Sequence, residues 1–317
     1  MRSYIVRRLI LIIPTVFLVS LIVFFMIRSI PGNIVDIMVS QMEFSSNVDR
    51  QAIIHSLGFD VPMITQYGHW MGNILLHGDL GKSLWENTPV INEIATRWPV
   101  TFELGFLSIL ISQIIALPIG IYSAIRQDTV GDYIARSVGI LCIAVPGFWL
   151  ATLIIVFPAI WWNYMPPMEL THFFTNPLGN LQMFILPALV LGMGMSGITM
   201  RMTRTMMLEV LRQDYIRTAW AKGLKERVVV IRHGLKNALI PVVTIIGGQI
   251  ATVLAGTVII ENIFSLPGIG QLIINATLQR DYTMVSGVLL LFAIVMVVVN
   301  LAVDVAYGFI DPRVHYK

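Results

Sequence analysis

Residues 201–241 read RMTRTMMLEVLRQDYIRTAWAKGLKERVVVIRHGLKNALIP and contain nine of the 21 Lys and Arg residues of the chain. Long apolar runs flank this basic stretch on both sides, at about 183–200 and 239–260. A polar segment between two such runs is typical of a loop between membrane spans, and an excess of Lys and Arg indicates the cytoplasmic side. The stretch therefore predicts a helical membrane protein with a large cytoplasmic loop.

The composition supports a membrane protein. Of the 317 residues, 56% are hydrophobic and only 12% are charged, and the mean hydropathy is +0.78. Soluble domains have about a quarter of their residues charged, so lipid must solvate much of this chain. The single cysteine, Cys142, excludes a disulfide framework. The net charge of +3 is small and unevenly placed, and we expect no nucleic-acid partner.

Six apolar runs can each supply roughly the 20 residues that a membrane-spanning helix needs. They lie at about 9–27, 102–125, 137–160, 183–200, 239–260 and 284–310. We therefore predict an all-α fold with six transmembrane helices. Short amphipathic pieces at 48–57 and 63–76 predict small helices outside the membrane.

The distribution of positive charge orients the spans. With the N-terminus inside, sixteen Lys and Arg residues lie on the cytoplasmic side and five lie outside. Both termini are therefore predicted to be cytoplasmic. We divide the chain into an N-terminal helix with a long external loop, residues 1–98, and a five-helix core, residues 99–317.

Several patterns resemble catalytic or metal-binding motifs. Residues 77–83, HGDLGKS, end like a phosphate-binding loop, but Leu76 stands where that motif needs glycine. Residues 192–197, GMGMSG, fit a dinucleotide fingerprint but lie inside a predicted span, where close helix packing is the better interpretation. His55, His69 and His77 share one loop, but their spacing matches no strong metal-ligand pattern.

Two hypotheses of other classes stay open. Residues 194–197 contain a G-x-S-G pattern found in intramembrane serine proteases, with Ser196 as nucleophile, but all six histidines lie in loops or the tail. A self-sufficient secondary transporter would need coupling-ion residues inside the membrane. Asp304, the candidate intramembrane polar site, could serve there, although a structural role is favoured for it.

The basic stretch predicts two short helices joined at a glycine. The run from Asp214 ends at Gly223, a typical helix terminator, and Pro241 then opens the next span. Exposed Tyr215 and Trp220 suit a groove of a partner protein, and we interpret the stretch as a docking loop for a separate motor protein. The alternative is an amphipathic hairpin on anionic lipid.

The loop resembles the signature of binding-protein-dependent ABC importer permeases, which has the general form E-A-A, three residues, G, nine residues, I-x-L-P. Arg217, Thr218 and Ala219 precede Gly223 by the right spacing, but Arg217 and Thr218 replace the first two letters, and Pro241 comes five positions late. This departure resembles the peptide/nickel subgroup, with R-T-A-x-A-K-G-L and N-A-x-I-P. Further pieces resemble the B-type subunit of dipeptide and oligopeptide permeases: YIVRR (4–8), IPG (30–32), GDLG (78–81), ILPA (185–188), ENIF (261–264), PGIG (267–270) and DPR (311–313).

The resemblance implies a type I ABC importer permease in a prokaryotic plasma membrane, with di- or oligopeptides as the expected substrate class. It implies a second homologous permease subunit, two ATP-binding subunits, an extracytoplasmic substrate-binding protein and surrounding membrane lipid as partners. This chain is expected to be no enzyme and to hold no cofactor or metal, with ATP and Mg on the partner subunits. The implied ATPase-coupling residues are Tyr215, Arg217, Thr218, Ala219, Lys222, Gly223 and Leu224. Asn237 and Pro241 are expected to punctuate the loop, and Pro267, Gly268 and Gly270 are candidates for gating or binding-protein contact.

Overall fold

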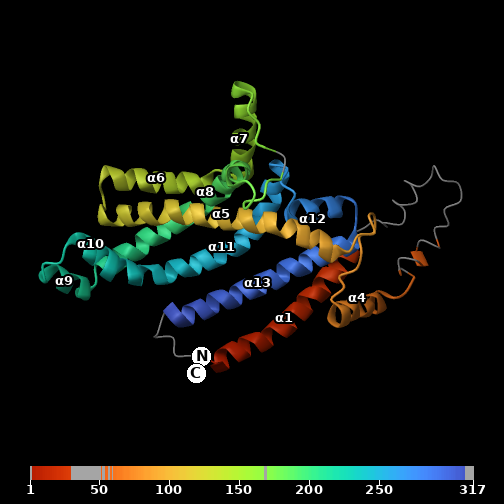
Figure 1. Cartoon of the computed structure of the whole chain (residues 1–317). Helices are drawn as coiled ribbons and strands as arrows, with labels where there is room; N and C mark the ends of the chain where they lie inside the picture. The colour runs from red at the N-terminus through yellow and green to blue at the C-terminus, as the bar shows by residue number, and fades with distance from the viewer. Residues whose placement is uncertain are drawn as a thin grey trace. The chain divides into compact units, whose positions relative to one another are not determined.

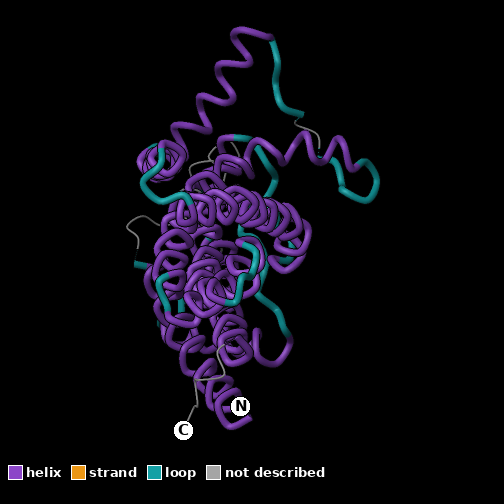
Figure 2. The backbone as a smooth tube through the Cα atoms, turned by 90° about the vertical axis from the view of Figure 1, so that its left-hand side faces the viewer, coloured by secondary structure: helices purple, strands orange, loops and turns teal. Residues whose placement is uncertain are grey.

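The computed structural model is built of α-helices joined by loops (Figure 2). It describes residues 2–29, 51, 54, 55, 58, 60–167 and 170–310, with side chains except at 2–9, 304 and 306–310. Within these ranges the β-structure is limited to an isolated bridge between Lys82 and Pro89. The expected all-α fold is confirmed. The predicted helix at 48–57 falls largely outside the described residues, as does the side chain of Asp304.

The chain forms two compact units. The first unit comprises Val100–Pro267 and Val298–Lys317, and the second comprises Arg2–Pro99 and Gly268–Val297. Helices α5 (Val90–Ile125) and α13 (Tyr282–Ile310) supply residues to both. The division predicted after residue 98 lies beside one of these joins, while residues 268–297 group with the N-terminal part of the chain.

Helix α8 is the central element of the first unit (Figure 1). It packs against α6, α7 and α11. In its most apolar 18-residue stretch 61% of the residues are buried, whereas in the other long apolar helices the share is 33% or less. A helix that contacts protein on several sides needs small residues for close approach. Besides parts of α5 and α13, the helices of this unit are α6 (Val130–Ala144), α7 (Gly147–Trp162), α8 (Pro177–Leu211), α9 (Asp214–Ala221), α10 (Glu226–Val228), the π-helix η1 (Val229–Leu235) and α11 (Lys236–Ile263).

Two glycines of the GMGMSG segment provide that close approach. A Cβ at Gly192 would lie 2.8 Å from the Ser108 carbonyl oxygen of α5, and one at Gly197 would lie 2.5 Å from the Gly139 carbonyl oxygen of α6. The predicted packing role of this segment is confirmed. The Ser196 hydroxyl is buried and donates to the Met193 carbonyl oxygen at 2.7 Å, within its own helix.

The predicted span at 137–160 is a bent pair of helices rather than one helix. It consists of α6 and α7, which meet at a 92° bend. Pro146 separates them and Val145 is extended, with φ −79° and ψ 120°. Proline lacks an N–H and forces the preceding residue away from helical geometry, which explains the break. The described residues thus contain five helices able to cross a membrane, or six if the bent pair counts as one.

Pro241 was predicted to begin the span that follows the basic loop, but it does not. It lies inside α11, which begins at Lys236 and follows η1 without a break. The π-helix η1 ends at Leu235, directly before α11, and π-helical turns are frequent at functional sites. The helix therefore extends continuously from the loop into the apolar run.

The second unit also contains α1 (Arg2–Arg28), α4 (Met63–His77) and α12 (Ile269–Leu278). The predicted helix at 63–76 is confirmed by α4. A buried carboxylate, Asp281, organises the turn before α5: Ser83 Oγ donates to its Oδ2 at 2.6 Å, and the Leu84 N–H donates to the same oxygen at 3.0 Å. Its Oδ1 accepts the Met284 N–H at 3.0 Å and so caps the start of α13.

Candidate functional site

The cytoplasmic loop begins where α8 ends. Gln213 is extended, with φ −72° and ψ 150°, and α9 starts at Asp214, whose carboxylate suits the positive end of the helix. Helix α9 stops after Ala221, and Gly223 adopts the left-handed conformation with φ +72°. The Leu224 N–H bonds to the Ala219 carbonyl oxygen at 3.4 Å and the Gly223 N–H to that of Trp220 at 2.9 Å. This is a Schellman motif, and the predicted helix end at Gly223 is confirmed.

One face of α9 is anchored to the rest of the loop. Ile216 and Ala219 are buried against Val229 of η1, with Leu211 and Leu224 packed around them. Leu224 thus supplies the hydrophobic contact that usually accompanies a Schellman motif. The helix is therefore held to both the end of α8 and the start of the next helical segment.

The opposite face of α9 is open to solvent. Tyr215 and Trp220 are 43% and 46% exposed. The side chain of Arg217 is 76% exposed and lies 3.1 Å from Asp214, an exposed pair of small energetic weight. Thr218, Lys222 and Gly223 are also exposed. Of the seven residues expected to couple, five lie on the open surface, whereas Ala219 is buried and Leu224 is half-buried.

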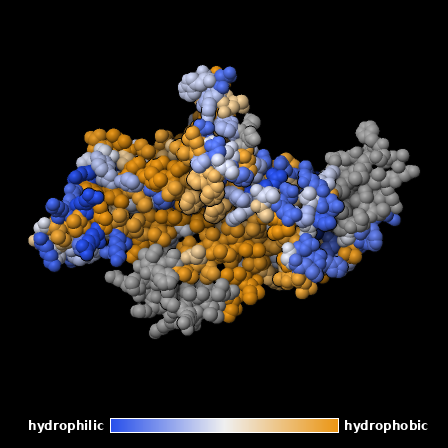
Figure 3. Space-filling view, viewed as in Figure 1, coloured by the Kyte–Doolittle hydropathy of each residue, from blue (hydrophilic) through white to orange (hydrophobic). Residues whose placement is uncertain are grey.

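Side-chain contacts connect the loop to both neighbouring helical segments. Asn237 Nδ2 donates to the Tyr215 hydroxyl at 2.8 Å, which joins α9 to the start of α11. Arg126, in the turn between α5 and α6, lies 3.5 Å from Glu226 of α10, both half exposed. In Figure 3 hydrophilic residues cover the end of the first unit that carries α9 and α10, and hydrophobic residues cover the helices next to it.

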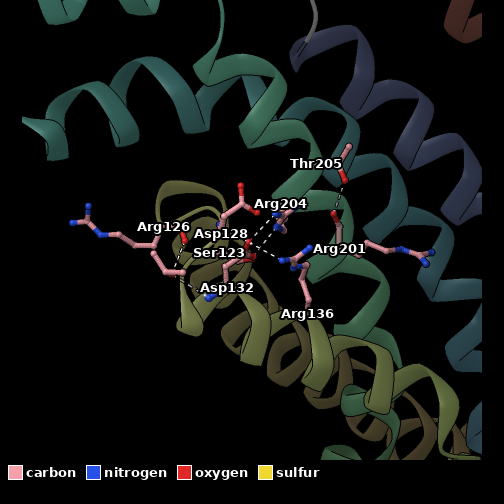
Figure 4. A network of polar contacts seen from close by, with 9 residues as sticks. Ser123, Arg126, Asp128, Asp132, Arg136, Arg201, Arg204 and Thr205 are labelled. Carbon is pink, nitrogen blue, oxygen red and sulfur yellow. Dashed lines mark hydrogen bonds and ion pairs between the residues drawn. The ribbon is translucent and has the colours of Figure 1, made fainter.

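Beneath the loop, a buried carboxylate joins three elements (Figure 4). Asp132, in the first turn of α6, has no exposed surface. Arg204 of α8 donates to it through Nε and Nη2, each at 2.9 Å, and the Asp128 N–H donates at 3.0 Å. The Ser123 hydroxyl of α5 donates to the same carboxylate. The sequence analysis missed this site, although Thr129, three residues before Asp132, is a helix-capping signal that marks the turn.

Polar side chains also lie inside the apolar helices of the first unit. Gln249 of α11 donates to Thr199 Oγ1 at 2.7 Å and to the Met195 carbonyl oxygen at 3.1 Å, and it accepts from Gln113 at 3.4 Å. Glu261, fully buried near the end of α11, accepts from Thr101 at 2.7 Å. Buried polar groups at membrane depth are satisfied by one another in this way. The sequence analysis singled out only Asp304 for such a role.

The remaining candidates are not part of the loop. Pro267 and Gly268 connect α11 to α12, and Gly268 precedes the first residue of α12 with φ −99°. Gly268 and Gly270 are buried and Pro267 is half-buried. Among the described residues, His, Cys, Asp and Glu side chains form no group of three able to hold a metal ion, and His55 instead contacts Asp60 at 2.7 Å.

These features define a multi-pass helical membrane protein with an ordered helical loop between α8 and α11. The chain belongs to the family of binding-protein-dependent transport system inner membrane components. The profile of that family matches residues 116–316, and the profile of its N-terminal part matches residues 1–105.

Relatives and solved structures agree with this assignment. The dipeptide transport system permease DppB of Escherichia coli is 37% identical over 340 residues, and a di/tripeptide permease DppB of Pseudomonas aeruginosa is 37% identical over 337 residues. Each alignment covers 100% of both proteins. An inward-facing structure of the MetNI methionine ABC transporter matches with a TM-score of 0.57 and 17% identity, over 69% of this chain and 96% of that one. An amino acid ABC transporter structure matches with a TM-score of 0.52 and 12% identity, over 71% and 95%. The expected family and importer-permease fold are confirmed.

Proposed function

We propose that this chain forms half of the translocation pathway of an ATP-driven importer for di- and oligopeptides. Full-length relatives named as dipeptide and di/tripeptide permeases support this substrate class. We further propose that the loop at about 209–232 docks into a groove of an ATP-hydrolysing subunit. The observation that carries this proposal is that one face of α9 is buried against the loop while the opposite face is open.

The two faces of α9 suit transmission of force. Ile216 and Ala219 are buried on the inner face, so α9 cannot move independently of the elements behind it. Tyr215 and Trp220 stand open on the outer face. Half-exposed aromatic side chains are enriched at protein–protein interfaces. A partner that grips the outer face would therefore move α8 and α11 together, because both continue directly into apolar spans.

The proposed assembly contains a second homologous permease subunit, two ATP-binding subunits and an extracytoplasmic substrate-binding protein. ATP and Mg bind the ATP-binding subunits in this scheme. The sequence of this chain supports the division of labour, because residues 77–83 lack the glycine that a phosphate-binding loop requires at position 76. We assign a gating role rather than direct contact to Pro267, Gly268 and Gly270, since both glycines are buried.

The test uses the assembled complex in sealed vesicles and measures ATP-dependent uptake of a labelled dipeptide. Trp220→Ala and Arg217→Gln alter the outer face of α9, and we expect each to lower uptake at least about tenfold, as for an interface hot spot. Lys236→Gln removes one positive charge from an exposed position at the start of α11, outside the proposed docking loop, and should leave uptake unchanged. Co-purification of the ATPase should fall in parallel with uptake.

Normal uptake in both α9 variants would refute the docking proposal. Lowered binding of the permease to anionic vesicles, with normal uptake and normal ATPase co-purification, would instead identify α9 as a lipid-surface helix. Uptake that persists without ATP would refute the ATP-driven importer.

A further inference from the structure

A cavity of about 270 Å³ lies between α6 and α8, just below the Asp132 cluster. Ile140 and Ile143 of α6 and Met200 of α8 form much of its apolar wall. Gly139 and Gly197 also line it, so the two helix backbones approach closely at its inner edge. The cavity lies entirely within the first unit.

The polar rim of this cavity is strongly cationic. Arg136, Arg201 and Arg204 line it, whereas no Asp or Glu does. Arg204 is already paired through two hydrogen bonds with Asp132, which lies behind the rim. The rim therefore holds more positive charge than its one adjoining buried carboxylate can neutralise. A ligand whose negative charge lies at this rim would neutralise the remaining positive charge.

Arg136 has unused hydrogen-bonding capacity. Its Nη2 lies 3.4 Å from Asp132 Oδ2, an ion-pair distance, yet within the described residues its Nε and Nη2 are buried without a hydrogen-bond acceptor. Its guanidinium lies over the Tyr133 ring, 4.4 Å from the centroid, which holds it in place. Buried guanidinium donors are normally satisfied, and phosphate oxygens are among the acceptors that Arg prefers. Figure 4 shows Arg136 and Arg204 approaching Asp132 from two helices.

The surroundings of the cavity are suited to lipid. On α6, Ile134, Ile140 and Leu141 are 58%, 66% and 61% exposed. Helix α6 starts a few residues after the cytoplasmic Arg126, which places its first turns at the depth of the cytoplasmic headgroups. Basic pockets between helices on that side bind anionic headgroups. An apolar wall below a cationic rim matches an acyl chain below a phosphate.

We propose that this cavity binds an anionic phospholipid of the cytoplasmic leaflet. The headgroup phosphate accepts hydrogen bonds from Arg136 and contacts Arg201, and one acyl chain lies along Ile140 and Ile143. The site is separate from the outer face of α9 and requires neither substrate nor ATP. A lipid bound here would stabilise the packing of α8 against α6.

Native mass spectrometry of the purified full-length chain tests the proposal. The protein is released from micelles that contain equal amounts of phosphatidylglycerol and phosphatidylcholine of the same acyl length. We expect preferential retention of phosphatidylglycerol. Arg201→Gln and Arg136→Gln should each lower that preference about fivefold, the effect of one basic residue near an anionic headgroup. The control Arg126→Gln lies outside the cavity and should not lower it.

Further measurements distinguish the effect of charge from that of the cavity, from misfolding and from binding of free phosphate. Ile140→Trp keeps all three arginines and fills the acyl part of the cavity, so it should lower retention of both lipids. Circular dichroism and elution volume confirm that each variant is folded.

Equal retention of the two lipids by the unaltered protein, or unchanged preference in Arg136→Gln and Arg201→Gln, would overturn the proposal. It would also be overturned if millimolar inorganic phosphate displaced the lipid completely, since an acyl-anchored ligand resists such competition. Crosslinking of Ile140→Cys to a second permease subunit, rather than to a photoreactive phosphatidylglycerol, would equally overturn it.

Discussion

Asp132 of α6 and Arg204 of α8 form a two-bond ion pair, with Nε and Nη2 each 2.9 Å from a carboxylate oxygen. Bidentate pairs of this kind fix orientation as well as distance. Helix α8 leads directly into α9, so the pair connects the first turn of α6 to the helix that supports the loop. A displacement of the loop would therefore reach α6 as well as α8.

We expect Asp132→Asn to destabilise the protein by about 1–3 kcal/mol. The substitution leaves Arg204 without its charged partner, but Arg136 and Arg204 retain some solvent, which keeps the loss below that of a fully buried pair. Thermal unfolding in detergent, followed by circular dichroism, provides the measurement. Asp128→Asn is the control, because the bond from its backbone N–H to Asp132 persists and Asn tolerates the positive φ of 60° found there. Equal melting temperatures for the two variants would contradict the role given to the ion pair.

Ala219→Arg should detach α9 from the loop rather than only block docking. Ala219 is 6% exposed and packs beside Ile216 and Val229, so the longer charged side chain cannot fit without displacing the helix. Limited proteolysis should show faster cleavage between α8 and η1. The neighbouring Thr218→Arg places the same side chain on the exposed face and should keep the loop resistant. Identical protection of the two variants would show that α9 is not anchored as described.

Gly223→Asp should leave the folded loop largely intact but lower transport. A Cβ at Gly223 would meet nothing within 4 Å, so the chain itself offers no steric conflict, and the cost is about 1 kcal/mol of left-handed strain. Uptake by the assembled complex should fall because the added carboxylate projects from the docking surface. Gly223→Asn, of similar size and better suited to positive φ, separates charge from bulk. Wild-type uptake with Asp at this position would argue against contact there.

Tyr215→Phe and Asn237→Ala should have non-additive effects. Each removes one partner of the 2.8 Å hydrogen bond between α9 and α11, worth roughly 0.5–1 kcal/mol at an exposed position. Hydrogen exchange of the α9 amides should accelerate in either variant, and the double variant should be little worse than the single ones. Fully additive acceleration would mean that the two side chains act independently.

Much of the architecture was predictable from local signals in the chain. The apolar runs, the charge asymmetry and the glycine at 223 depend on composition and on residues near one another in sequence, and helix α4, the end of α9 and the family were predicted correctly. The 92° bend had a local signal too, in Pro146, but the length of the apolar run outweighed it. The continuation of α11 past Pro241 had no such signal, because proline usually opens or breaks a helix rather than lying inside one.

The sequence by itself determined that this protein is an all-α membrane protein with a basic loop between apolar spans, because hydrophobicity, charge and helix punctuation act locally. The motifs of that loop then indicated the permease family by resemblance. Tertiary structure alone decided which face of α9 is buried, with Ala219 on the buried face and Trp220 on the exposed one. It also decided that Asp132 pairs with Arg204, 72 residues further along the chain. Such pairings arise from the packing of helices that are distant in sequence. In the first unit, that packing depends on the close approach of α6 and α8 at Gly139 and Gly197.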